Sequence, residues 1–201
     1  TNKFDETRET SGTTLSCYFN AVIPAFERLK KEGKIDHWGI GLGQEEALIK
    51  AINSSTPPEA MQCAVNILNS IGAIGYLSEK NDPNKILNEC QDKNIPILAI
   101  RAVQAGALTL SMDREPHSSG LDEDDFKDFE KAMPFRKFAE NIGENPASLA
   151  HRYALSVDKV SSVNLGVKNR AELIECIAAE EKGQLEKEMI SKMDNLFESV
   201  K

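Results

Sequence analysis

Cysteine is scarce in this 201-residue sequence, and its four cysteines, Cys17, Cys63, Cys90 and Cys176, are widely separated. No two of them form a CxxC pair, and their spacing fits neither a zinc site nor a dense disulfide framework. We therefore predict reduced thiols, no metal site and a cytoplasmic location, although a single disulfide is compatible with the sequence.

Positive charge is scarce too, since 24 Lys and Arg residues stand against 32 Asp and Glu residues, a net charge of −8. Nucleic acids and anionic membranes both attract basic surfaces, so neither is expected as a partner. No apolar run approaches the roughly 20 residues that a membrane helix needs. The polar start, residues 1–12, lacks the apolar core of a signal peptide. It also lacks an initiator Met, which is compatible with a start inside a longer protein.

Short β-prone runs alternate with stretches in which apolar residues have helical spacing. Strands are expected at 36–42, 60–65, 96–100 and 161–165. Helices are expected at 18–31, 44–53, 82–93, 126–141, 146–154, from 169 onwards, and at 186–200. Polar loops are expected at 1–17 and 111–125. This order predicts one α/β domain, residues 1–201, with a parallel sheet. The apolar runs at 60–65 and 96–100 are typical of parallel strands covered on both faces.

The stretch from Val160 to Cys176 is interpreted as a strand, a glycine turn at Gly166 and a capped helix. Asn169 and Glu172 have the spacing of a capping box. Such a joint presents backbone N–H groups and the positive end of a helix dipole at the carboxyl end of a strand, where anions bind. Lys168 adds a cation beside it. The alternative is an ordinary strand-to-helix turn with a surface lysine.

Glycines or polar residues also follow the other predicted strands, with Gly41 and Gly43 after the first, Gln62 in the second and Arg101 after the third. Sites in parallel α/β folds lie at the carboxyl ends of strands. Arg101 is placed to meet a phosphate or carboxylate, and the alternative is an ion pair with a neighbouring loop acid. For Gln62 the alternative to a ligand contact is a structural hydrogen bond.

Three segments resemble aldo-keto reductases in both order and spacing. They are RLKKEGKIDHWGIGL at 28–42, ILNECQDKNIPILAIRAVQAGALT at 86–109, and the block from Phe135 to Leu185, which includes ENPASLAHRYALSVDKVSSVNLGVKNRAELIECIAA. The resemblance covers nearly the whole chain from about residue 18, and the last segment is its strongest part.

The resemblance implies a (β/α)8 barrel of the TIM type that reduces aldehydes or ketones with a nicotinamide nucleotide, NADP being favoured over NAD. In this resemblance Gln62 matches a glutamine near the nicotinamide. The loop over the pyrophosphate matches Arg101 to Leu108, which gives Arg101, Val103, Gly106 and Leu108 as candidates. The positions around the adenosine and its 2′-phosphate match Gly166, Val167, Lys168, Glu172 and Glu175.

The sequence departs from the family pattern at three positions near the cofactor. Gly41 and Leu42 stand where the family has a Ser-Asn pair, Ile100 stands where it has an aromatic residue, and Cys176 stands where it has an asparagine that touches adenine. These departures bear on how the nicotinamide and the adenine would be held.

The length also departs from the family, since four strands are predicted where a barrel has eight and typically about 250 residues. We therefore expect the C-terminal half of the barrel, strands five to eight, without the family's catalytic Asp, Tyr, Lys and His. A carbonyl substrate is expected only if the N-terminal half is supplied, and the open sheet edges favour a homodimer. The alternatives are a non-enzymatic nucleotide- or phosphate-binding half-barrel or assembly module, and a small doubly wound domain with an unrelated ligand.

Overall fold

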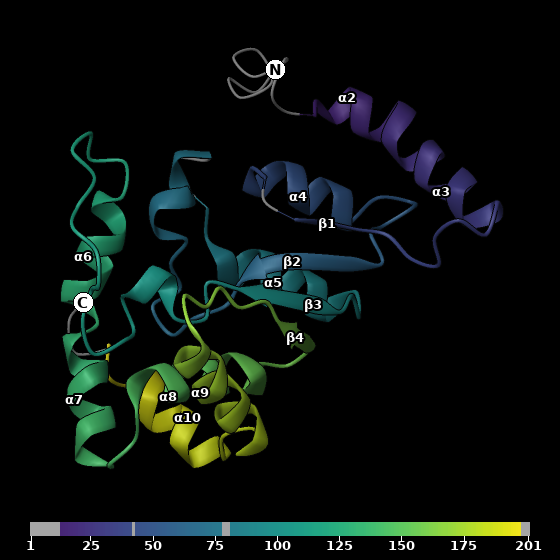
Figure 1. Cartoon of the computed structure of the whole chain (residues 1–201). Coiled ribbons are helices and arrows are strands. Elements are labelled where there is room, and N and C mark those ends of the chain that lie inside the picture. The colour runs from purple at the N-terminus through teal and green to yellow at the C-terminus, as the bar shows by residue number, and fades with distance from the viewer. Residues whose placement is uncertain (1–12, 42, 78–80, 198–201) are drawn as a thin grey trace.

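The fold is built on one sheet of four parallel strands. The computed structural model describes residues 13–41, 43–77 and 81–197. The strands lie in chain order, with β1 at Gly39–Gly41, β2 at Ala60–Ala64, β3 at Ile97–Ile100 and β4 at Val160–Val163 (Figure 1). The predicted parallel α/β sheet is confirmed, and each strand is shorter than its predicted run.

Helices precede, separate and follow the strands. Before β1 the chain forms one continuous helical segment from α2 (Leu15–Cys17) through the π-helix η1 (Tyr18–Val22) to α3 (Ile23–Lys31). Between strands lie α4 (Glu45–Ile52), the 3-10 helix η2 (Gly72–Leu77), α5 (Pro83–Asp92), the 3-10 helix η3 (Gln104–Gly106), α6 (Glu123–Lys131), α7 (Met133–Asn141) and α8 (Pro146–Ser156). After β4 come α9 (Arg170–Glu181) and α10 (Lys187–Asp194).

The helix starts that the sequence predicts at Asx-Pro pairs are confirmed. The Asp82 carboxylate accepts a hydrogen bond from the backbone N of Asn84 at 3.0 Å, and the Asn145 side chain accepts from the backbone N of Ala147 at 2.8 Å. Each cap therefore satisfies an N–H that the first turn of a helix leaves without a partner.

Three of the predicted boundaries are wrong. The polar loop expected at 111–125 ends earlier, because α6 begins at Glu123. The single helix expected at 126–141 is split into α6 and α7, because Pro134 lacks the N–H that would continue the helical ladder. The polar loop expected at 1–17 ends at Thr14, whose hydroxyl caps the helix by accepting from the backbone N of Cys17 at 3.1 Å. Residues 1–12 of that loop lie outside the described residues.

Helices cover only one face of the sheet in the described part of the chain. Met61 and Ile97 are fully buried against residues of α4, α5 and α8. On the opposite face Gln62, Leu98 and Ile100 are only half-buried. The sequence predicts cover on both faces, and the structure supplies it on one.

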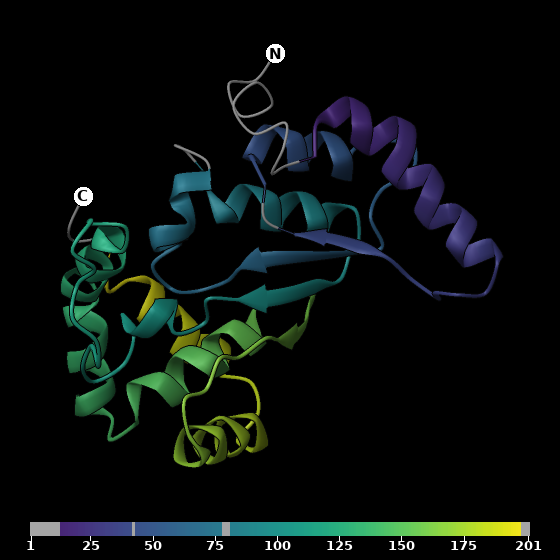
Figure 2. The ribbon, with the colours of Figure 1, turned by 45° about the horizontal axis from the view of Figure 1, so that its top comes forward.

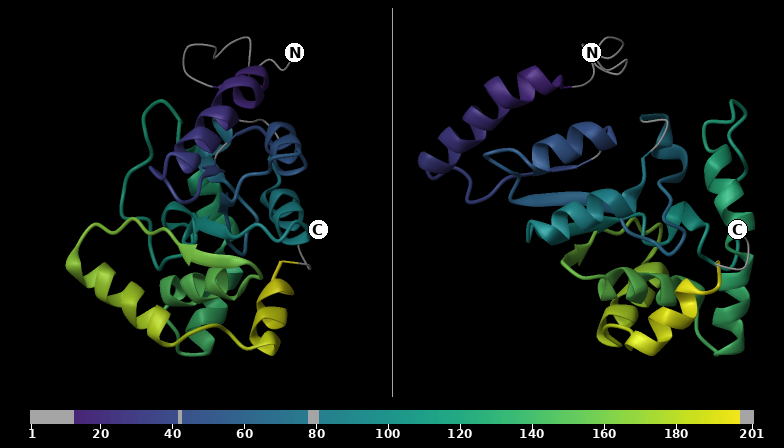
Figure 3. Two further views of the ribbon diagram at one scale, coloured as in Figure 1. Left: turned by 90° about the vertical axis from the view of Figure 1, so that its right-hand side faces the viewer. Right: turned by 180° about the vertical axis from the view of Figure 1, so that it is seen from behind.

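The helices beyond the two edge strands form separate layers. Beyond β1, α3 packs through Phe26, whose ring stacks on that of Trp38 with centroids 5.3 Å apart. Beyond β4 lie α8, α9 and α10, at the opposite side of the molecule from the N-terminal helix (Figure 3).

In Figure 2 the strand arrowheads point towards the end at which α6 and α7 stand. A second apolar cluster lies at this end, around Phe135 and Leu108.

Apolar side chains are exposed in the segment that follows the last strand. Leu165 and Val167 follow β4, and Leu173, Ile174 and Ile177 lie on α9, each between 39% and 55% exposed. β1 and β4 are the edges of the sheet. No helix of the described residues is long and apolar enough to cross a bilayer.

We expect the 201-residue chain to associate with itself at micromolar concentration. Strand edges with unpaired backbone groups and exposed apolar patches both favour association. Sedimentation velocity across a concentration series measures it, and Ile174→Glu together with Ile177→Glu should shift the distribution towards monomer. A stable monomer of the unaltered chain over the whole series would contradict this prediction.

Candidate functional site

A buried polar cluster joins the loops after β2 and β3 to α6. Its members are Asn66, Ser70, Arg101, Gln104, Asp125 and Asp128. The Gln104 amide is fully buried and donates to the Asp128 carboxylate at 2.7 Å, while its carbonyl accepts from Nε of Arg101 at 3.0 Å. The Arg101 guanidinium forms an ion pair with Asp125, which is only 3% exposed. The cluster therefore fixes the path of both loops.

The backbone after β3 turns tightly within this cluster. Arg101, Gln104 and Ala105 have φ angles of 60°, 46° and 51°, in the left-handed region that side chains rarely adopt. Gly106 follows with a φ of 98°. A strained backbone persists only where surrounding contacts hold it in place. Here the hydrogen bonds of Arg101 and Gln104 to α6 and to the loop after β2 hold it. The chain after Gly106 is thereby directed towards β4.

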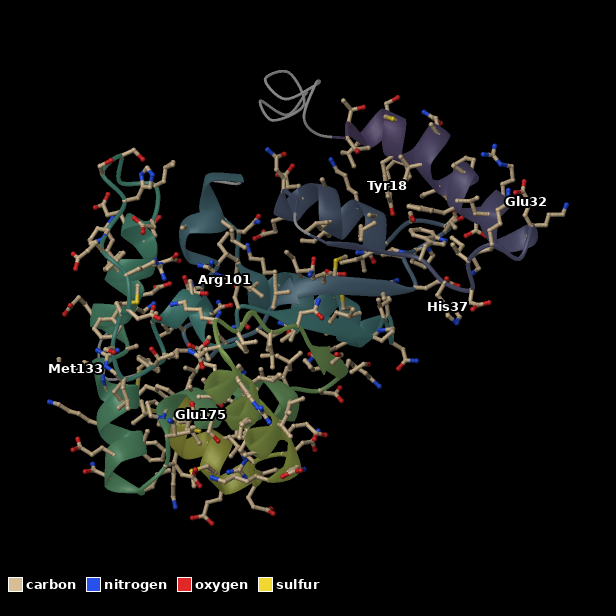
Figure 4. All side chains as sticks on the ribbon, viewed as in Figure 1. Tyr18, Glu32, His37, Arg101, Met133 and Glu175 are labelled. Carbon is tan, nitrogen blue, oxygen red and sulfur yellow. The ribbon has the colours of Figure 1, made fainter. Side chains whose placement is uncertain are left out.

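A cleft of about 460 Å³ lies between this loop and the segment after β4. Its walls come from the loop of residues 103–114, the first half of α8, the turn after β4 and the first half of α9. The lining residues are Val103, Ala105, Gly106, Thr109, Leu110, Ser111, Asp113, Arg114, Asn145, Ala147, Ser148, His151, Gly166, Val167, Lys168, Glu172, Glu175 and Cys176. In Figure 4 the labelled Arg101 lies at the sheet and Glu175 among the C-terminal helices.

The predicted capping box is present at the start of α9. The Asn169 side chain accepts from the backbone N of Glu172 at 3.0 Å. The Glu172 carboxylate reaches back and accepts from the backbone N of Lys168 at 2.7 Å and from the amide of Asn169 at 2.9 Å. These bonds hold the turn rigidly. The Glu172 carboxylate is thereby occupied largely by hydrogen bonds within the first turn of its own helix.

An ion pair between Lys168 and Asp113 crosses the cleft and joins the turn to the loop after β3. The pairing with the Lys168 ammonium is the main reason why the pKa of Asp113 lies below its usual value. Arg114 also lines the cleft and donates to the Asp125 carboxylate at 3.0 Å. Two cations thus reach the cleft, and both already contact carboxylates.

A cysteine and a histidine meet in the cleft wall where α9 packs on α8. The Cys176 sulfur lies 3.4 Å from Nε2 of His151. Burial lowers the pKa of His151, and burial together with Glu175 and Glu172 raises the pKa of Cys176. The pair is therefore a neutral thiol beside a neutral imidazole at neutral pH.

The family follows from comparison with known sequences. The model of the aldo/keto reductase family matches residues 5–198. The chain belongs to this family. Curated protein sequences give no significant match.

Solved aldo-keto reductase structures resemble the fold at low sequence identity. An aldo-keto reductase from Bacillus halodurans in its holo form has a TM-score of 0.66 and 20% identity, over 92% of this chain and 58% of its own. The glycerol dehydrogenase from Gluconobacter oxydans has a TM-score of 0.62 and 21% identity, over 86% of this chain and 52% of its own. A thermostable aldo-keto reductase crystallised with the inhibitor epalrestat has a TM-score of 0.58 and 19% identity, over 86% and 53%. This aldo-keto reductase chain thus spans slightly more than half the length of the structures it matches.

The structure brings most of the predicted cofactor residues together. Val103, Gly106, Gly166, Val167, Lys168, Glu172 and Glu175 all line the cleft. These residues follow the third and fourth strands, so the carboxyl ends of β3 and β4 meet as the alternation of strands and helices predicts.

The other three predicted residues have side chains outside the cleft lining. Arg101 follows its alternative interpretation, an ion pair with an acidic residue, Asp125. Leu108 is fully buried in the apolar cluster around Phe135. Gln62 lies on β2 beside Gly41, where an added Cβ would approach the Gln62 Cβ to 2.7 Å. A side chain at position 41 would therefore require Gln62 or its strand to shift.

Sequence reasoning missed the contribution of α8 and of the 111–114 segment. Asn145, Ser148 and His151 line the cleft, and so do Asp113 and Arg114. From the sequence, Asn145 is a helix cap, and the long loop at 111–125 is either an excursion near a site or a simple insertion. The packing of α8 against α9 is a tertiary contact, which leaves no local signal in the sequence. Among the described residues no group of three or more His, Cys, Asp or Glu side chains could hold a metal ion.

We predict that Asp125→Ala lowers the free energy of unfolding by about 3 kcal/mol, because it leaves two arginines without their buried partner. Asp124→Ala is the matched control, since Asp124 is exposed and contacts only Lys127 at 3.1 Å, a pair whose loss should cost less than about 1 kcal/mol. Urea unfolding followed by circular dichroism measures both. Equal effects of the two substitutions would show that the cluster does not stabilise the loops.

Proposed function

We propose that this chain is the cofactor-binding C-terminal half of an NADP-dependent aldo-keto reductase, an oxidoreductase that reduces aldehydes or ketones. The observation that carries the proposal is the cleft at the carboxyl ends of β3 and β4, with Lys168 beside the capped N-terminus of α9. A helix N-terminus and a cation together favour a phosphate group.

The uncovered face of the sheet supports the half-barrel part of the proposal. Leu98 and Ile100 carry apolar side chains on a face that no described helix covers. In a closed barrel this face would point inward and be filled by side chains. Four further strand–helix units would pair both sheet edges and cover the exposed residues of α9. The chain covers 52% to 58% of the matched structures, slightly more than the half that four of eight units would give.

The residues of the cleft suit the parts of a dinucleotide. Ser111 offers a hydroxyl group on the side of the β3 loop, and Lys168 offers an ammonium group on the side of α9. The Thr109 hydroxyl also lines the cleft, but it donates to the Gly106 carbonyl at 2.8 Å. When bound, NADPH supplies the hydride for carbonyl reduction. The role of this half is then to hold the phosphates and the adenosine, while the missing half supplies the proton donor.

The position of Glu172 favours NADP over NAD. A free carboxylate near Lys168 would repel a 2′-phosphate, but the Glu172 oxygens accept hydrogen bonds from the Lys168 N–H and the Asn169 amide. The repulsion is reduced, because these donors already neutralise part of its charge. Lys168 remains the cation that a 2′-phosphate would meet.

A second candidate is a nucleotide-binding or assembly module without enzymatic activity. The exposed Leu173, Ile174 and Ile177 on α9 favour it, because they form an apolar surface for another chain. Adding a separately produced N-terminal aldo-keto reductase half discriminates between the two, since only the first candidate gains reductase activity. For either candidate we propose a cytoplasmic location, in which the four free thiols stay reduced.

The isolated chain should have no carbonyl reductase activity. The described lining of the cleft includes no tyrosine and no lysine–tyrosine pair that could protonate the carbonyl oxygen. NADPH consumption with a nitrobenzaldehyde, followed at 340 nm, is the measurement. Turnover on the order of 1 per second would mean that the chain carries its own acid.

Lys168→Ala should weaken binding of 2′-phosphorylated adenosine nucleotides by about tenfold at low salt, since it removes one charge-assisted contact. Binding of the nucleotide without the 2′-phosphate should change little. Lys182→Ala is the matched control, because it removes the same charge from a pair with Glu144, at 2.8 Å, outside the cleft. Titrations of NADP and NAD into all three proteins decide the matter. Equal losses for both nucleotides would give Lys168 a structural role only.

A further inference from the structure

The cleft contains a thiol and an imidazole in contact, to which the proposed cofactor binding gives no role. Cys176 and His151 both line the cleft, and the Cys176 sulfur faces the His151 Nε2 at 3.4 Å. The imidazole is only 8% exposed, and its Nδ1 is buried without a hydrogen-bond partner among the described residues. A buried polar atom without a partner is costly. Among the described residues, the hydrogen-bond partner of the ring is therefore the Cys176 sulfur at Nε2.

Cys176 differs from the other three cysteines in its surroundings. Cys63 and Cys90 are buried in the core between the sheet and α5, where burial raises their pKa values to about 12 and about 11. Cys17 is exposed on α2. Cys176 alone lines the described cleft, so it is the thiol whose modification would fill that space.

We propose that Cys176 is a covalent modification site for small, uncharged α,β-unsaturated carbonyl compounds, with His151 as the group that accepts its proton. The sulfur attacks the β-carbon of the electrophile and forms an S–C bond, while the C=C electron pair moves to the enolate. The thiol proton passes to His151 Nε2 and then to the α-carbon, so the adduct is a neutral thioether. No oxidant or further reactant is needed.

The charges around the thiol explain the class of electrophile. Glu172 and Glu175 lie on the same helix as Cys176 and raise its pKa. The other charged side chains that line the cleft are Asp113, Arg114 and Lys168, and His151 faces the thiol from α8. A free thiolate is therefore disfavoured, and reaction requires that the proton leave as the bond forms. An anionic reagent at the thiol would meet the carboxylate of Glu175 and, less strongly because its charge is partly compensated, that of Glu172. An uncharged conjugated carbonyl would meet no such repulsion.

The adduct should also exclude the nucleotide, and this part rests on the proposed function. Glu175 and Cys176 are neighbours on α9, in the half of the cleft where the adenosine is proposed to lie. A thioether on the sulfur would occupy part of the cleft of about 460 Å³. Nucleotide binding and modification would then be mutually exclusive.

The test uses the full chain with Cys17→Ser, which removes the exposed thiol, and N-ethylmaleimide as the uncharged probe. We expect one adduct, located at Cys176 by peptide mass spectrometry, and none in the Cys17→Ser/Cys176→Ser chain. His151→Gln should slow the reaction by about tenfold or more, because a positioned base is lost. Thermal melting checks that the variant is folded. An adduct on Cys63 or Cys90 instead, or an unchanged rate in folded His151→Gln, would overturn the proposal.

The dependence on pH gives a second test that needs no histidine variant. If His151 accepts the proton, the rate should level off between pH 7 and 8, since the lowered pKa of His151 keeps the imidazole neutral throughout that range. If hydroxide removes the proton instead, the rate should rise about tenfold per pH unit below the thiol pKa. A labelling rate that keeps rising about tenfold per pH unit from pH 7 to 8 would overturn the role of His151.

Protection by NADP separates this inference from the proposed function. Modification in the absence of nucleotide tests the Cys176–His151 pair alone, and a titration tests nucleotide binding alone. If NADP binds and slows labelling, the adduct shares the nucleotide's space. If NADP binds and labelling is unchanged, the exclusion is wrong. If NADP does not bind but labelling is as expected, the modification site stands and the proposed cofactor site fails.

Discussion

A parallel sheet needs cover on both faces and partners at both edges, because its strands carry apolar side chains on each side. In this chain α4, α5 and α8 cover one face, and the other face presents Leu98 and Ile100 half-buried. Apolar residues of α9, the helix that packs on α8, are exposed as well. The uncovered sheet face, the two sheet edges and the exposed residues of α9 all lack packing partners in this chain. One set of four further strand–helix units would cover the face, pair the edges and bury these residues. The need for cover therefore links the fold to the proposed half-barrel.

The cleft depends on a second constraint, the buried cluster around Asp125. Arg101 stands at the carboxyl end of β3, where a cation is well placed for a ligand phosphate, yet its guanidinium turns to Asp125 and Gln104. The fold uses this charge to hold a strained loop, because left-handed residues need contacts that outweigh their strain. Residues of this loop, from Val103 to Arg114, can then line the cleft. The arginine that looked functional in the sequence acts on the site through the loop.

Local features of the sequence predicted the fold's elements well. Apolar periodicity and Asx-Pro pairs located the strands and helices, and the spacing of Asn169 and Glu172 predicted a cap whose bonds are present at 2.7–3.0 Å. What the sequence could not provide was the partner of each charge. Asp125 lies 24 residues from Arg101, and Asp113 lies 55 residues from Lys168. Such pairings depend on how loops pack in three dimensions, so no periodic pattern in the sequence indicates them.

The pairing of Lys168 with Asp113 sets the electrostatics of the proposed cofactor site. Two cations and three carboxylates line the cleft, Arg114 and Lys168 against Asp113, Glu172 and Glu175. A phosphate can therefore bind only if some carboxylate charge is already compensated. The helix start compensates Glu172, and Lys168 itself compensates Asp113. A 2′-phosphate must share Lys168 with Asp113, and this sharing ties the 111–114 segment to the bound nucleotide. The Lys168–Asp113 ion pair would then determine both the selectivity for the 2′-phosphate and the position of the 111–114 segment.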